Sequence, residues 1–161
     1  IDGHGQIGMC LAPDDAYLIQ RGLRTLSVRL KQHMETGLIL ARWLETRPEV
    51  ARVIHPALPS HPDHALWQRD FTGASGLFSI ELTPCSDDAL AAMLDDLELY
   101  GMGYSWGGYE SLIVPQYPAK IRTATKYEAE GPLLRIHAGL ESPEDLMADL
   151  EAGFDRLNAA R

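Results

Sequence analysis

The sequence has no long apolar run, only two cysteines, and too few basic residues to balance its acids. No stretch approaches the roughly 18 apolar residues that a membrane-spanning helix requires, and no secretory signal opens the sequence. Cys10 and Cys85 are too few for a disulfide framework, which favours a reducing cytoplasm. The net charge of -9 provides no basic face for nucleic acid or an anionic membrane. We therefore expect a cytoplasmic protein whose ligand is a small molecule.

A cluster of metal-ligating residues is also missing. His55, His61 and His64 lie in or beside a proline-rich loop, but no group of acids or cysteines accompanies them. A zinc site needs several such ligands at suitable spacing. We therefore predict surface histidines and no metal site.

The chain is long enough for one globular domain with an ordinary core. Its 161 residues lie within the roughly 100–200 that are typical of one domain, and 45% of them are hydrophobic. Apolar residues recur at steps of three and four from Leu23 to Leu44, which predicts a long amphipathic helix that ends before Pro48. Ser142, followed by Pro143 and two acids, predicts the start of a final helix.

Between these helices, alternating or β-branched segments predict strands, and two further helices are predicted to begin near Pro13 and Ser86. Helices that cover one face of a small sheet are the packing that this order of elements favours. The predicted fold is therefore an α/β two-layer sandwich with a small, largely antiparallel sheet and helices on one face. The predicted strands are residues 50–54, 76–83, 99–104, 111–114 and 133–137.

A glycine-rich segment, Tyr104–Ser111, is the first candidate site. Its two adjacent glycines permit backbone conformations that other residues avoid. Such a turn brings main-chain N–H groups, the Ser105 hydroxyl and the Trp106 indole close to a ligand. A hairpin turn with aromatic packing explains the same composition, so both interpretations remain open.

The second candidate is Arg135, which lies between apolar neighbours in the predicted strand 133–137. Alternation along a strand places Arg135 and His137 on the same face. A half-buried arginine requires an anion, because an unpaired charge there is costly, and its planar fork suits a carboxylate. The partner is either a ligand or an acid of the same chain, and the sequence leaves both open.

A rival interpretation comes from Gly103–Gly107, which matches the G-x-S-x-G pattern of serine hydrolases, with His137 downstream. In that fold a helix follows the nucleophilic serine directly. Here Gly107 and Gly108 predict a turn, and the next segment predicts a strand. A hydrolase that uses Ser105 is therefore a secondary hypothesis.

Several blocks occur in a fixed order along the chain. They are Arg21–Leu26 followed by Arg29 and His33, Val53–Pro59, Arg69–Phe78, Tyr104–Ser111 and Leu134–Glu141. Taken together, these blocks characterise one family: the chain from about Asp14 to Phe154 resembles the C-terminal part of the pyridoxal-phosphate (PLP)-dependent enzymes of cysteine and methionine metabolism. Trp106 favours the cystathionine β-lyase branch over the γ-lyases and synthases of the same family.

The resemblance implies roles for four residues. Arg135 would grip the α-carboxylate of a small amino-acid substrate, Ser105 and Trp106 would help to hold it, and Tyr104 would sit beside the pocket. The resemblance also implies a carbon–sulfur lyase that depends on PLP and is a homotetramer when intact. It places no catalytic and no cofactor-binding residue in this chain, because the family's cofactor lysine and phosphate ligands lie upstream of such a segment.

Lys126, in Thr123–Tyr127, is similar to the family's Ser-x-Thr-Lys-Tyr cofactor site, but it precedes Arg135 by only nine positions. In the family the cofactor lysine lies much farther upstream, so Lys126 is not expected to bind PLP and the segment is expected to be inactive by itself. Residues 1–13 are then a remnant of the cofactor-binding domain or a linker, and residues 14–161 are the substrate-carboxylate-binding domain. A non-catalytic binding or oligomerisation module with the same fold is the alternative from another class.

Overall fold

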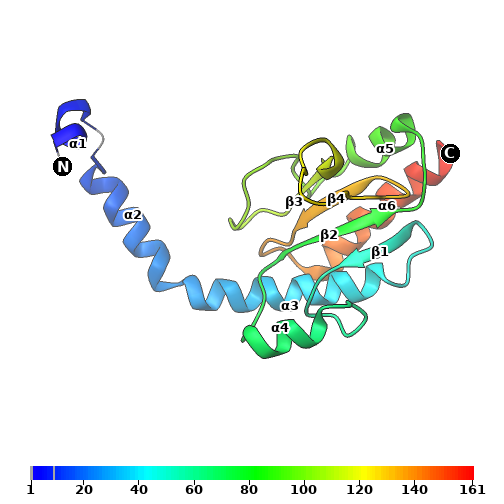
Figure 1. The fold of residues 1–161 in the computed structure, drawn as a ribbon, viewed down its shortest axis with the longest axis horizontal. Helices are drawn as coiled ribbons and strands as arrows, with labels where there is room; N and C mark the ends of the chain where they lie inside the picture. The colour runs from blue at the N-terminus through cyan, green and yellow to red at the C-terminus, as the bar shows by residue number, and fades with distance from the viewer. Residues whose placement is uncertain (1, 9) are drawn as a thin grey trace.

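The computed structural model describes residues 2–8 and 10–161, and Figure 1 shows their arrangement. Helix α2 extends away from the body of the molecule and has no buried residue, and α1 lies at its outer end, whereas the elements from α3 onward pack around one small sheet. None of the helices in the described residues is long and apolar enough to cross a membrane. The elements are α1 (Asp2–Ile7), α2 (Pro13–Arg24), α3 (Leu26–Leu44), β1 (Val50–Ile54), α4 (His64–Asp70), β2 (Leu77–Leu82), α5 (Asp87–Leu94), β3 (Leu112–Gln116), η1 (Pro118–Lys120), β4 (Leu133–His137) and α6 (Pro143–Ala159).

The sheet has four strands in the order β1-β2-β4-β3, and every neighbouring pair is antiparallel. Alternate residues of each strand point into a core that α3, α5 and α6 close, so the predicted two-layer α/β sandwich is confirmed. Apolar side chains supply this core because burial removes their surface from water. Its fully buried members include Leu40, Leu44, Ile80, Leu82, Met93, Leu134, Ile136, Leu150 and Phe154.

The predicted helix starts at Ser86 and Ser142 are confirmed. The Ser86 side chain accepts a hydrogen bond from the backbone N–H of Ala89, and the Ser142 side chain accepts one from Asp145. Acidic residues in the first turn of each helix interact favourably with the positive end of the helix dipole. These local signals hold because both partners lie within one turn of the chain.

The long helix predicted from Leu23 begins instead at Leu26, because α2 and α3 are separated at Thr25. The break frees the carbonyl of Gly22, which accepts a hydrogen bond of 2.8 Å from Nη2 of Arg29. The Thr25 hydroxyl also donates to this carbonyl, at 3.3 Å. These side chains replace the helical bonds that the break removes.

The prediction of a strand over Leu99–Tyr104 is wrong. Only Gly101 forms an isolated bridge, with the start of β3. The carboxylate of Asp149, on α6, accepts hydrogen bonds of 2.9–3.3 Å from three consecutive backbone N–H groups, those of residues 98–100. Those N–H groups therefore bond to a side chain and do not form the hydrogen bonds of a β-sheet. Tyr100 is buried in the core. The segment becomes the anchored beginning of the loop that follows.

Replacement of Phe154 by alanine is expected to lower the free energy of unfolding by about 3–5 kcal/mol, because it opens a cavity in the fully buried core. Ile121→Ala is the control, since Ile121 is 81% exposed and should change stability by less than about 0.5 kcal/mol. Urea unfolding followed by circular dichroism measures both. Equal unfolding midpoints for the two variants would contradict this description of the core.

Candidate functional site

The face of the sheet opposite the core carries Arg135. Its neighbours in sequence, Leu134 and Ile136, are fully buried in the core, so alternation directs Arg135 to the other side. Strand β4 is an inner strand, and Arg135 lies between Ser79 of β2 and Val114 of β3. The guanidinium therefore rises from the middle of the sheet and not from an edge.

The backbone of the glycine-rich loop holds the Arg135 guanidinium. Its Nη2 donates hydrogen bonds to the carbonyl of Gly103, at 3.0 Å, and of Tyr104, at 2.7 Å. The guanidinium carbon also lies 6.0 Å from the centroid of the Tyr104 ring, within range of a cation–π contact. Within the described part of the chain, no acid forms a salt bridge with Arg135. Neutral carbonyls orient the cation without cancelling its charge, which leaves it able to bind an anion.

Ser111 fixes the far end of this loop. Its backbone N–H donates a hydrogen bond of 2.8 Å to Oε1 of Glu141, and its hydroxyl donates one of 2.8 Å to Oε2 of the same carboxylate. The same hydroxyl accepts a bond of 2.8 Å from the N–H of Gly139. A Cβ at Gly139 would collide with the backbone of Tyr109, so only glycine permits the loop to approach β4 this closely.

A histidine fixes the middle of the loop. The N–H of Gly107 donates a hydrogen bond of 3.2 Å to Nε2 of His137, which is 2% exposed. Gly107 has a φ of 92°, a left-handed conformation that glycine adopts without strain. Burial lowers the pKa of His137, and the neutral ring is the form whose nitrogen accepts this bond.

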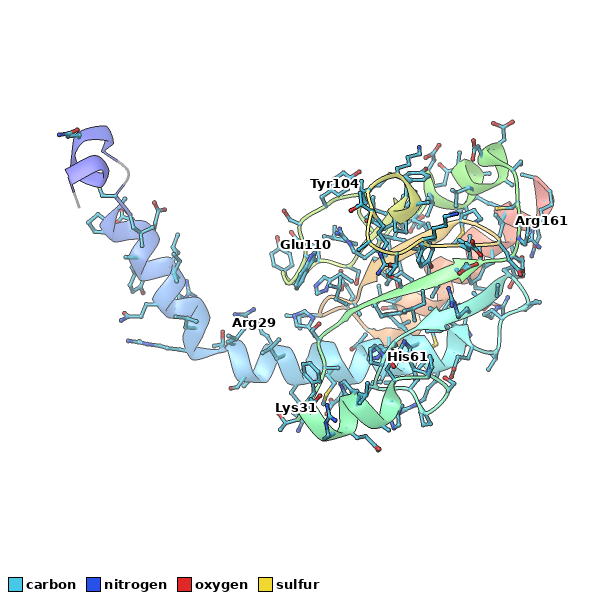
Figure 2. All side chains as sticks on the ribbon, in the orientation of Figure 1. Arg29, Lys31, His61, Tyr104, Glu110 and Arg161 are labelled. Carbon is cyan, nitrogen blue, oxygen red and sulfur yellow. The ribbon has the colours of Figure 1, made fainter. Side chains whose placement is uncertain are left out.

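The side chains at the tip of the loop remain exposed. Tyr104 is 77% exposed and Trp106 is 54% exposed, and Ser105 between them is also exposed. Figure 2 shows Tyr104 and Glu110 on this loop, at the end of the body from which α3 leads toward α2. Arg135, Tyr104, Ser105 and Trp106 are thus brought to one place, since Arg135 bonds to the residues directly before the Ser105–Trp106 turn.

The geometry does not match the serine-hydrolase hypothesis. Ser105 is followed by a turn at Gly107 and then by β3, and not by a helix. In the residues that the structure describes, no hydrogen bond joins Ser105 to His137, whose Nε2 is occupied by Gly107. Ser105 therefore has no base beside it to activate its hydroxyl.

The remaining predicted features are ordinary. Lys126 is exposed in the loop between η1 and β4, and Cys10 and Cys85 are free thiols. The described residues contain no group of three or more histidines, cysteines or acids that could hold a metal ion. The prediction of surface histidines is wrong for His55, which is buried and accepts a hydrogen bond from the N–H of Ala57. His61 and His64 are half-buried and bond to backbone groups of their own loop.

Sequence reasoning gave no role to Glu141, Ser111 or His33. All three lie within blocks that the resemblance includes, but nothing in the spacing of Glu141 and Ser111 shows that they bond to each other. His33 falls on the helix face that becomes buried, and a polar residue on such a face is a signal that marks a specific contact. Its partner, His137, lies far along the chain, so the sequence does not reveal the pair.

Comparison with known proteins identifies a family that matches most of this chain. Residues 3–155 match the family model described as Cys/Met metabolism PLP-dependent enzyme. A cystathionine beta-lyase of Salmonella typhimurium is 54% identical over 94% of this chain, and one of Escherichia coli is 51% identical over the same share. The chain spans 39% of the length of each of these relatives.

A solved structure shares the fold. The crystal structure of cystathionine gamma synthase from Xanthomonas oryzae pv. oryzae, in complex with aminoacrylate and cysteine, superposes with a TM-score of 0.81 at 37% identity. The match covers 97% of this chain and 41% of that one. The chain therefore belongs to the family of Cys/Met metabolism PLP-dependent enzymes.

Proposed function

We propose that this chain supplies the substrate-carboxylate site of a PLP-dependent carbon–sulfur lyase, cystathionine β-lyase. The intact enzyme would convert L-cystathionine and water to homocysteine, pyruvate and ammonia, a step toward methionine. The observation that carries the proposal is the Arg135 guanidinium, which neutral carbonyls hold beside the Ser105–Trp106 turn. Two cystathionine beta-lyases at about half identity support the choice of this branch.

Arg135 binds and orients, and it makes or breaks no bond. Nη2 is committed to two carbonyls, and the N–H groups of Nε and Nη1 remain to donate to a carboxylate. The Ser105 hydroxyl and the Trp106 indole N–H supply further donors beside it. Fixing the α-carboxylate fixes the direction of the substrate's Cα–H bond, which is an orientation effect on the reaction.

The residues of this chain do not fit the attachment of PLP itself. Its three lysines, Lys31, Lys120 and Lys126, are all exposed, and a lysine that bonds to PLP must lose its proton in an enclosed site. Bound PLP supplies an electron sink for the substrate carbanion. We assign its binding to residues outside this chain and give this chain the role of holding the substrate.

The oligomer and the compartment belong to the same proposal. We infer a homotetramer for the intact enzyme, as the family resemblance implies, and a cytoplasmic location. The low cysteine content supports this location. A γ-lyase or synthase of the same family is the second candidate, because the γ synthase from Xanthomonas oryzae pv. oryzae shares the fold of nearly the whole chain.

Arg135→Lys in the intact enzyme is expected to lower kcat/KM for L-cystathionine by about 10- to 100-fold. A lysine keeps the charge, but its single ammonium cannot bond to the two loop carbonyls and to a carboxylate in the geometry of the planar guanidinium. Steady-state kinetics measure the effect, with Arg122→Lys at an exposed position as the control. A kcat/KM near that of the control would remove the role given to Arg135.

Lys126→Ala in the intact enzyme is expected to leave both the visible absorbance of bound PLP and the lyase activity unchanged. Lys126 lies on an exposed loop with nothing to enclose the cofactor. Absorbance spectroscopy of the purified variant tests this, with Lys120→Ala as the matched control. Loss of the visible band in Lys126→Ala alone would show that the cofactor lysine lies in this chain after all.

The products formed from L-cystathionine distinguish the two candidate activities. Cleavage on the cysteine side of the sulfur gives pyruvate and homocysteine, which is the result expected. Cleavage on the other side gives 2-oxobutyrate and cysteine. Mass spectrometry of the 2-oxo acid decides between them, and 2-oxobutyrate as the main product would establish a γ-lyase.

A further inference from the structure

Two buried histidines from distant parts of the chain lie side by side beneath the glycine-rich loop. His33 of α3 and His137 of β4 are each 2% exposed, and their ring centroids are 5.1 Å apart. Nδ1 of His33 lies 2.7 Å from the carbonyl of Ala138. A Cβ at Gly76 would collide with this same Ala138 backbone, so the absence of a side chain there preserves the tight packing around the pair.

The hydrogen bonds fix where each ring carries its proton. A carbonyl only accepts, so Nδ1 of His33 carries hydrogen toward Ala138, and the neutral ring keeps a lone pair on Nε2. Nε2 of His137 accepts from Gly107, so its neutral ring carries hydrogen on Nδ1. The remaining nitrogens, Nε2 of His33 and Nδ1 of His137, are buried and form no hydrogen bond in the described residues. The two rings therefore pack against each other without a hydrogen bond between them.

The same nitrogen of His137 has two mutually exclusive partners. Nε2 is 3.2 Å from the N–H of Gly107 and 3.3 Å from the carbonyl of Gly108. With a lone pair it accepts from Gly107, and with a hydrogen it donates to Gly108. The N–H of Gly107 points at Nε2, and a hydrogen on Nε2 would collide with it, which favours the tautomer that accepts from Gly107.

We propose that His137, packed against His33, is a positioning residue that fixes the Ser105–Trp106 turn through the N–H of Gly107. This inference rests on the proposed function, because it assigns the pair to the carboxylate-binding turn of the lyase. Neither histidine is required to contact the substrate. Their effect is to hold the turn in its binding conformation before the substrate arrives, which lowers the ordering cost of binding.

Acid should release this contact. Burial is the largest cause that lowers the pKa of His137 below its ordinary value of 6.5. The Gly108 carbonyl opposes this lowering of the pKa, as does Glu141 before α6, whereas His33 from α3 and Arg135 from β4 act in the same direction as burial. In the closed turn the buried His137 ring is neutral, whereas in a released turn the ring binds a proton more readily. The hydrogen bond from Gly107 to His137 therefore weakens as pH falls below the ordinary pKa of histidine. A protonated Nε2 cannot accept from Gly107.

The test uses three variants of the intact enzyme, with steady-state kinetics on L-cystathionine. His137→Leu is expected to raise KM about 3- to 10-fold, the range for loss of one neutral hydrogen bond, and to change kcat less. His33→Leu should raise KM in the same direction by a smaller factor. His137→Gln places a side-chain oxygen where Nε2 lies, so it should restore KM and remove the rise in KM that the wild-type enzyme shows at acid pH.

Hydrogen exchange of residues 103–109 provides a readout that does not depend on activity. The backbone amides of this peptide should exchange faster in His137→Leu than in the wild type, and His137→Gln should return them toward the wild-type rate. If the wild type cleaves no thioether but the exchange pattern holds, the proposed function fails and the positioning of the loop stands.

Three results would overturn the inference. They are an unchanged KM and exchange rate in His137→Leu, an acid dependence of KM that is as large in His137→Gln as in the wild type, and a His137→Gln variant that behaves like His137→Leu. If His137→Leu does not fold, the comparison of His137→Gln with the wild type across pH still decides. Other buried histidines, such as His55, contribute equally to both proteins in that comparison.

Discussion

The site depends on a cation that rises from the middle of a sheet and is held without being neutralised. Arg135 stands on an inner strand, and two backbone carbonyls of the glycine-rich loop orient one of its nitrogens. A carboxylate in that place would have cancelled the charge and satisfied the guanidinium within the chain. Carbonyls orient the guanidinium at a smaller electrostatic cost and leave its positive charge available to bind an anion. The rest of the loop lies around this cation.

The loop itself is irregular, yet three different chemical contacts fix it to the sheet and to α6. The carboxylate of Asp149, on α6, accepts hydrogen bonds from backbone N–H groups at the beginning of the loop. The carboxylate of Glu141 accepts one from Ser111 at the end of the loop. A neutral imidazole, His137, takes the N–H of Gly107 in the middle. The exposed side chains of the tip are thus carried on an anchored backbone, which suits a surface that closes on a small polar group.

Local signals in the sequence predict the observed structure where both interacting residues lie within one turn of the chain. The caps at Ser86 and Ser142 and the alternation of 133–137 are examples. The strand expected over Leu99–Tyr104 failed for the opposite reason. Its pattern suits a strand, but Asp149, far along the chain, takes the N–H groups that a ladder would need. Propensity was overridden by a tertiary hydrogen bond.

The sequence by itself determined much of the core, the helix starts at Ser86 and Ser142, the family resemblance, and the placement of Arg135 on the strand face away from the core. Periodicity and capping are local, and an ordered set of blocks is visible without coordinates. Only the tertiary structure decided what Arg135 bonds to, that Glu141 clamps Ser111, and that His33 meets His137. Those partners lie on different elements, and chain folding, not residue spacing, brings their atoms within hydrogen-bonding or packing distance.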